Sequence, residues 1–261
     1  TFHTIKADIF ADCSGDSVLA PLTGAKWTKG REARSEYNES IAPEEADLKT
    51  MGMSCLIQAR EHNRKIEFVK PEWAYTYNDD SELPNRGHSL KHAATNFWWM
   101  ELGGLQDTIE DAEEIRDELL KLSFGVWDHI KNHGDHGMEN WELEWIGFLP
   151  GKRESRRMMG EYILTQRDVS DGVVFPDEIA FGGWPLDDHN PYGMRRGGDK
   201  QFSAIVTPVK EPYGIPLRCL CSKDVDNLMF AGRNISVSHV ALSSARVMAT
   251  CALLGQAAGT A

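Results

Sequence analysis

The sequence predicts an α/β protein in which a long mixed α+β segment separates two short elements near the ends. Three observations support this prediction. Residues 226–261 combine an apolar run, a Gly-Arg-Asn turn and a stretch of small residues. Residues 5–10 are expected to form a strand that enters an Asp-Cys-Ser-Gly-Asp turn at residues 12–16. The middle of the chain contains an amphipathic helical pattern at residues 108–131.

The closing element has the residues of a strand, a turn and a helix. The apolar run at residues 228–231 is typical of a buried strand, and Gly232 permits a close backbone approach that a larger residue would obstruct. Ser236 and Ser238 offer oxygens to cap the following helix, whose first amide groups suit an anionic or electron-rich ligand. A tightly packed core helix without a ligand is the alternative.

The opening and middle segments carry further local signals. Pro21 and Gly24 are expected to close a short helix after the opening turn. Thr108 and Asp111 form a plausible cap for the long helix, and residues 132–134 supply its end. Residues 53–58 and 66–69 predict a pair of antiparallel strands, and the charged residues 29–47 predict an exposed excursion.

Composition narrows the classes of function. The 261 residues, of which 41% are hydrophobic, suffice for a core in one or two domains. A net charge of -12 argues against a nucleic-acid partner. No apolar run approaches the about 18 residues of a membrane span. The five cysteines are expected to be reduced thiols, and their spacing does not predict an iron-sulfur cluster.

Histidine pairs do not predict a metal site. His88 and His92 are four residues apart, which two ligands on a helix could use, but no third ligand is evident. His133 and His136 lie in a glycine-rich turn with Asp135 and are expected to be exposed loop residues. The aromatic cluster at residues 96–100 is interpreted either as a pocket wall or as core.

Four segments resemble one known family. Residues 226–261 resemble the C-terminal flavin-contacting segment of FAD-dependent oxidoreductases of the heterodisulfide reductase type, in which a substrate domain separates two parts of the FAD domain. Residues 7–25 resemble the second FAD-contacting strand and turn. Residues 149–169 and 175–189 resemble the arginine-rich strand, turn and helix that follow, in the same order.

The resemblance implies a fold, a cofactor and a set of contacts. The fold would be an incomplete FAD/NAD(P)-binding Rossmann-like domain with an inserted α+β substrate domain. Its parts would be residues 1–27, 28–215 and 216–261. The cofactor would be FAD, with contacts implied at Ser14, Gly15, Asp16, Arg156, Arg157, Gly232, Arg233, Asn234, Ser238 and His239. Pairing with local acids is the alternative for the arginines, and capping or packing is the alternative for His239.

One element of such enzymes is missing from the sequence. No glycine group has the G-x-G-x-x-G spacing of a dinucleotide-binding turn. We therefore expect that this chain is a piece of a longer protein and that the N-terminal FAD-binding segment of that protein is its partner. We expect this piece alone to hold FAD weakly. A cytoplasmic location is the first expectation, and an exported one stays open.

Asp188 and His189 are the candidate catalytic residues. When an alcohol or amine is oxidised by flavin, a base takes a proton as hydride leaves, and a histidine oriented by a carboxylate suits this task at neutral pH. An exposed loop histidine is the alternative. The predicted function is hydride transfer between a small organic substrate and flavin. A non-catalytic binding or structural module on a flavoprotein scaffold and a histidine-based metal hydrolase are the other hypotheses.

Overall fold

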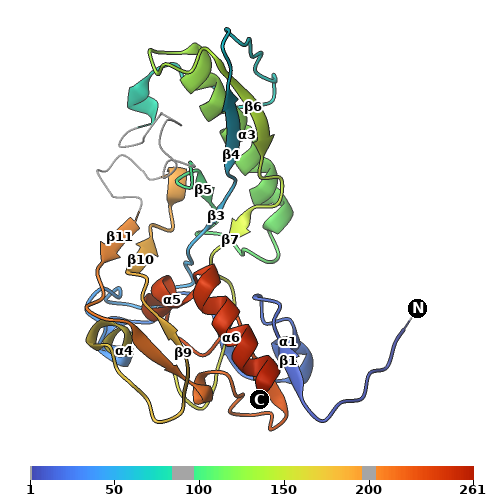
Figure 1. Ribbon diagram of the computed structural model, residues 1–261, viewed down its shortest axis with the longest axis vertical. Helices are drawn as coiled ribbons and strands as arrows, with labels where there is room; N and C mark the ends of the chain where they lie inside the picture. Colours follow the sequence, from blue (N-terminus) through green and yellow to red (C-terminus); the bar gives the residue numbers. More distant parts are fainter. Residues whose placement is uncertain (1, 84–96, 196–203) are drawn as a thin grey trace. The chain divides into compact units, whose positions relative to one another are not determined.

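The computed structural model describes residues 2–83, 97–195 and 204–261, and it is a mixed α/β protein (Figure 1). The chain divides into two compact units. Unit 1 comprises Thr1–Thr50, Arg153–His189 and Ala204–Ala261, and unit 2 comprises Met51–Lys152 and Asn190–Ser203. Unit 1 thus includes residues that the sequence assigned to the middle domain. The predicted boundaries divide the chain by role, into cofactor and substrate domains, whereas these units are defined by compactness. The predicted boundaries therefore stay a prediction.

Unit 1 joins the opening and closing elements of the sequence. Strand β1 (Phe10–Asp12) pairs in parallel with β13 (Leu228–Phe230), so that Asp12 lies opposite Phe230. The first strand therefore begins later than the predicted residues 5–10. Helix α1 (Leu19–Thr23) ends at Gly24, whose left-handed φ of 80° confirms the predicted helix end. The pairing brings the two predicted cofactor-facing turns to the same end of adjacent strands.

The closing helix is broken in two. Helices α5 (His239–Ala245) and α6 (Met248–Thr260) meet at 93°, so the single predicted helix is wrong. Ser238 caps α5, because its Oγ accepts a hydrogen bond from the Ala241 amide at 3.1 Å. Every residue of α5 is buried, whereas α6 buries only Thr250 and Leu254. Among the described residues, no single helix is long and apolar enough to cross a membrane, and only α5 and α6 taken together meet that test.

Short antiparallel pairs complete unit 1. Strand β2 (Trp27–Thr28) pairs with β8 (Arg157–Met158), β9 (Glu178–Gly182) with β12 (Tyr213–Pro216), and β10 (Leu186–His189) with β11 (Ala204–Thr207). Besides α1 and α5, the short helices described in the unit are α2 (Arg34–Tyr37), α4 (Gln166–Asp171) and η3 (Leu217–Cys219).

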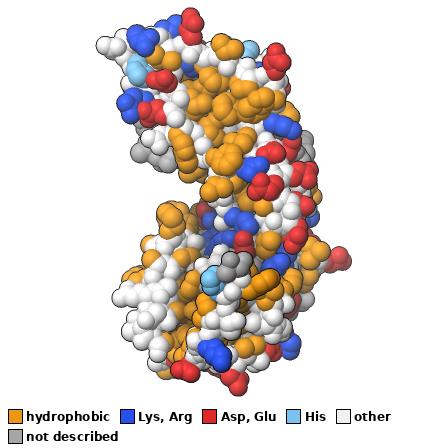
Figure 2. Space-filling view, turned by 90° about the vertical axis from the view of Figure 1, so that its right-hand side faces the viewer, with side chains coloured by type: hydrophobic (Ala, Val, Ile, Leu, Met, Phe, Trp, Pro, Cys, Tyr) orange, Lys and Arg blue, Asp and Glu red, His pale blue; other side chains and the backbone are white. Residues whose placement is uncertain are grey.

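Unit 2 packs a long helix against small sheets. Helix α3 (Ala112–Asn132) buries Leu119, Val126 and Trp127 on one face. Strand β4 (Ile57–Glu61) pairs with β6 (Trp141–Ile146), and β3 (Met53–Ser54) lies between β5 (Glu101–Leu102) and β7 (Gly151–Lys152). The turns η1 (Asp80–Glu82) and η2 (Gly193–Arg195) belong to the same unit. Figure 2 shows hydrophobic side chains gathered on the visible face of unit 2, in the upper part of the view.

Two predictions for unit 2 are wrong. The partner of β4 is β6 rather than residues 66–69, and β6 alternates apolar and acidic residues as a half-buried strand does. Helix α3 starts at Ala112 rather than at residue 108. The preceding residues form a turn instead, in which the Asp107 amide donates to the Asp111 carboxylate at 2.9 Å and Asp107 accepts from the Ile109 amide.

Replacing Gly255 in α6 by alanine is expected to stabilise the protein. A Cβ built at Gly255 meets no atom within 4 Å, so the change keeps the helix and restricts the unfolded chain, with a gain of about 0.5–1 kcal/mol. Gly125 in α3 is the matched control, because a Cβ there would lie 2.4 Å from the Tyr75 carbonyl oxygen. Urea midpoints should rise for Gly255→Ala and fall for Gly125→Ala. A lower midpoint for Gly255→Ala would contradict the exposed placement of this helix face.

Candidate functional site

The turn after β1 is organised by one buried carboxylate. Asp12 Oδ1 accepts hydrogen bonds from the Ser14 amide at 3.0 Å and the Ser14 hydroxyl at 2.6 Å, and Oδ2 accepts from the Leu19 amide at 2.8 Å. Gly15 adopts a φ of 75°, in the left-handed region that favours glycine. Asp12 therefore fixes the turn from its buried side. Ser14 is exposed and Gly15 is half-buried.

Arg233 connects this turn to two distant parts of the chain. Its guanidinium donates to the Gly15 carbonyl oxygen at 2.5 Å, to Ser155 Oγ at 2.8 Å and to Asp16 Oδ1 at 2.7 Å. Ser155 Oγ also donates to Asp16 Oδ1 at 2.6 Å. Asn234 Nδ2 donates to the Asp12 carbonyl oxygen at 3.2 Å. The structure thus brings together five of the predicted cofactor contacts: Ser14, Gly15, Asp16, Arg233 and Asn234.

The turn at residues 232–236 has features that fit a hydrogen-bonding cofactor. Gly232 has a φ of 105°, which a residue with a side chain adopts only with strain. Asn234 Oδ1 and Ser236 Oγ are buried, and neither has a hydrogen-bond partner among the described residues. Buried polar atoms normally have a partner in the protein, in ordered water or in a ligand, so these two atoms are available to a bound group. The donor and acceptor set of this turn therefore fits the flavin that the resemblance implies.

A second cluster surrounds the buried Arg157. Its side chain is fully buried and donates to Glu32 Oε1 at 2.5 Å, to the Gly30 carbonyl oxygen at 2.8 Å, and to Glu154. Pairing with local acids, the alternative left open by the sequence, describes the contact with Glu154, whereas Glu32 is 125 residues away in the chain. Arg156, next in the chain, instead lies over the Trp27 ring with 5.2 Å between its Cζ atom and the ring centroid.

His239 joins the same cluster through both ring nitrogens. Nδ1 lies 2.9 Å from Glu154 Oε2, Nε2 lies 3.0 Å from Asp188 Oδ1, and the backbone amide donates to Glu32 Oε2 at 2.9 Å. Carboxylates only accept, so both ring nitrogens donate and the ring is an imidazolium. Although burial alone would lower the pKa of His239, the charges of Glu154 and Asp188 raise it to about 10. At neutral pH this ring has no lone pair with which to take a proton.

Glu39 holds the start of α5 from another side. Its Oε1 accepts from the Ser238 hydroxyl at 2.5 Å and from the Gln166 amide at 2.7 Å. Burial raises the pKa of Glu39, against the hydrogen bonds from Ser238 and Gln166. The prediction that residues 29–47 form an exposed excursion is therefore wrong at Glu32 and Glu39, which are 7% and 1% exposed. Isolated acids in a charged run carry no sequence signal of burial, because their partners lie far away in the chain.

Successive side chains of a strand point to opposite faces, so Asp187 and His189 of β10 share one face and Asp188 lies on the other. Asp188 points to His239, whereas His189 Nε2 lies 3.4 Å from Asp187 Oδ2. Although burial alone would raise the pKa of Asp187, its hydrogen bond with His189 and the charge of Arg246 hold that pKa below its usual value. His189 is only 4% exposed, so the alternative of an exposed loop histidine is wrong. The carboxylate that orients His189 is that of Asp187, and Asp188 orients His239.

Nine of the ten predicted contacts fall into two groups, and Arg156, which lies over the Trp27 ring, belongs to neither. Ser14, Gly15, Asp16, Arg233 and Asn234 share the turn network, with Gly232 beside them, whereas Arg157, Ser238 and His239 belong to the buried charge cluster. Glu32, Glu39 and Glu154 were missed by sequence reasoning, and the surplus cations near residue 157 were the one available signal. His88, His92 and Asn96 lie outside the described residues.

A comparison with protein families identifies the class that these features define. A family model described as FAD dependent oxidoreductase matches residues 2–261. The chain belongs to this family, and FAD is the cofactor of the family. Searches of curated proteins and of solved structures found no match.

Proposed function

We propose that the chain forms part of an oxidoreductase that transfers hydride between a small organic substrate and FAD. Unit 1, with the parallel pair of β1 and β13 followed by α5, would supply an incomplete Rossmann-like FAD domain, and an α+β segment inserted in it would cover the substrate. The observation that carries the proposal is the Arg233 network, which assembles both family-like turns. The family match supports it independently.

The chain's own residues divide the work of holding the cofactor. FAD, when bound, supplies the acceptor or donor of hydride. Ser14, Asn234 and Ser236 are the residues that would hydrogen-bond it, because Ser14 is exposed and because Asn234 Oδ1 and Ser236 Oγ lack partners within the described chain. Asp16 and Arg233 would act by fixing the turn, since each already bonds the other. The fully buried Arg157 would act only through Glu32 and Glu154.

His189 is the residue proposed to take the substrate proton. Oxidising an alcohol or amine carbon removes a hydride from carbon and a proton from oxygen or nitrogen, and a neutral imidazole beside a carboxylate can receive the proton. Asp187 fits the role of the orienting carboxylate. Asp188, predicted as a catalytic residue, is proposed instead to hold the His239 imidazolium, which places a fixed positive charge at the start of α5.

Arg233→Ala is expected to weaken FAD binding at least about tenfold, since the turn would lose its hydrogen bonds to Gly15, Asp16 and Ser155. The test uses the parent protein with its dinucleotide-binding segment, which we propose supplies the pyrophosphate site. Flavin absorbance after dialysis and titration of the apoprotein measure the affinity.

Arg167→Ala is the matched control, because Arg167 lies on α4 with an exposed side chain, 3.6 Å from Asp171. A parent protein that shows no flavin bands when saturated with FAD would overturn the cofactor assignment. Bound flavin that no alcohol, hydroxy acid, sugar or amine reduces would favour the non-catalytic module instead.

A further inference from the structure

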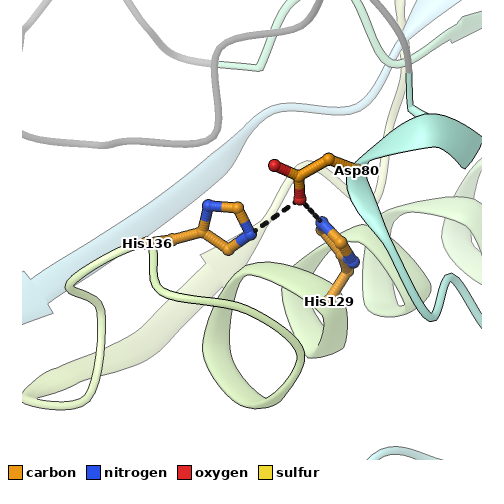
Figure 3. A group of neighbouring side chains, drawn as sticks. All are labelled: Asp80, His129 and His136. Atoms are coloured by element: carbon orange, nitrogen blue, oxygen red, sulfur yellow. Dashed lines mark hydrogen bonds and ion pairs between the residues drawn. The ribbon is translucent and has the colours of Figure 1, made fainter.

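Two histidines and an aspartate of unit 2 converge at the end of α3 (Figure 3). His129 lies in the last turns of α3, His136 follows in the next loop, and Asp80 begins η1. Asp80 Oδ1 lies 3.1 Å from His129 Nε2 and 3.2 Å from His136 Nε2. All three ligand atoms lie within 4.8 Å of one another. The expectation that His136 is an exposed loop residue is wrong, because its side chain is 10% exposed.

We propose that Asp80, His129 and His136 form a binding site for a divalent first-row transition-metal ion, represented by Zn²⁺. Ligands at 2.0–2.1 Å from a tetrahedral zinc ion are about 3.3 Å apart. The two distances from Asp80 Oδ1 to the histidine nitrogens, 3.1 and 3.2 Å, are close to that separation. Two imidazole nitrogens and one carboxylate oxygen are a common ligand set for such ions and leave a coordination position for water.

The hydrogen bonding of His129 supports a cation at this place. Its Nδ1 lies 3.0 Å from the Tyr77 carbonyl oxygen, which can only accept, so Nδ1 carries the hydrogen. The other ring nitrogen, Nε2, is then the one that can bind a metal ion, and it faces Asp80 Oδ1 at 3.1 Å. A bond from the second ring nitrogen to a backbone carbonyl is the usual support of a histidine ligand.

The surroundings give the three residues fixed positions and give an ion access. The His129 side chain is fully buried, whereas the Asp80 side chain is 67% exposed, so an ion can reach the site from solvent. Asp79 accepts a hydrogen bond from the Ser81 amide at 2.8 Å and thereby fixes the turn that carries Asp80. Gly134 lies close to the third ligand, since a Cβ there would be 2.8 Å from His136 Nε2. A bound ion would join η1 to the end of α3.

The test is a titration of the metal-free chain with Zn²⁺ by calorimetry, repeated with Co²⁺ by visible absorption. We expect saturable binding of one ion per chain and a rise in the melting temperature. His136→Gln and Asp80→Asn should each weaken binding at least about tenfold, which corresponds to about 1.4 kcal/mol. Binding should also weaken as the pH falls, because protons compete for the imidazole nitrogens.

His133→Gln is the matched control. His133 lies near the same end of α3, but its Nε2 faces Asp128 at 3.2 Å, outside the proposed ligand set. This variant should bind Zn²⁺ as tightly as the unsubstituted chain does. The absence of one-to-one binding, or binding that survives in both Asp80→Asn and His136→Gln, would overturn the proposal. Because Asp80 is exposed, its variant keeps the test valid if a histidine variant fails to fold. Neither result bears on the flavin proposal.

Discussion

His239→Gln is expected to lower the free energy of unfolding by about 3–5 kcal/mol at neutral pH. The substitution removes a buried positive charge that lies between Glu154 and Asp188 and bonds both carboxylates. Removing one partner of a buried ion pair leaves the other charge without compensation. Because domains are stable by only about 5–15 kcal/mol, this loss is a large share of the total.

The stabilisation by His239 should depend on pH with a definite sign. The pKa of the ring is raised from 6.5 to about 10 in the folded protein, so the folded state binds the proton more tightly than the unfolded chain. The contribution is complete below pH about 6.5 and is lost as the pH rises towards about 10. The difference in urea midpoint between the wild-type protein and His239→Gln should therefore shrink over that interval.

Asp188→Asn gives the matched comparison for this prediction. It removes one of the two charges that raise the His239 pKa, so the stabilisation should be smaller and should disappear at a lower pH than in the wild-type protein. Comparing variants cancels the titration of other groups near pH 10. A difference in midpoint that stays constant from pH 6 to pH 10 would show that His239 is not an imidazolium in the folded protein.

His189→Gln is expected to slow reduction of bound flavin by about 10²–10⁴-fold. Glutamine keeps a polar side chain of similar reach but cannot take a proton. Stopped-flow absorbance of the parent protein measures this rate, with whichever alcohol, hydroxy acid, sugar or amine reduces the wild-type flavin. Flavin content and the circular dichroism spectrum show whether the variant is folded.

Two further variants show whether slower flavin reduction comes from the loss of the proton acceptor or from a general disturbance of the structure. Asp187→Asn should slow reduction less than His189→Gln, because it removes only the carboxylate beside the ring. His62→Gln is the matched control and should leave the rate unchanged, since the ring of His62 already pairs with Glu142, 2.8 Å away. A wild-type rate in His189→Gln would assign the proton to another group and refute the proposed role.

Local chemistry explains which parts of the fold were predictable. Gly24, Ser238 and the strand β13 follow from a left-handed helix end, a helix cap and a short apolar run, all of which depend on neighbouring residues. The partner of β4 and the start of α3 were missed. In the first case, the long-range pairing with residues 141–146 decided the structure, and in the second, Asp107 and Asp111 formed a local turn.

The candidate site was predictable where its residues lie within family-like segments. The turn residues from Ser14 to Asp16 and the Arg233-Asn234 pair were named from family-like segments, and the structure places them together. The burial of Glu32 depends instead on Arg157, 125 residues away, and that of Glu154 depends also on His239, 85 residues away. Sequence reasoning paired Asp188 with its neighbour His189, but a strand directs adjacent side chains to opposite faces.

The parallel pair of β1 and β13 has a consequence for the order of folding during synthesis. Asn234 and Asp12, whose hydrogen bond closes the turn network, are 222 residues apart in the chain. Most of unit 2 lies within residues 51–152 and is complete long before β13 leaves the ribosome. Contacts of such long sequence separation form slowly, because a large loop has to close first. The pairing of β1 with β13 therefore cannot form until almost all of the chain between the two strands has been synthesised, which places it among the last steps of folding.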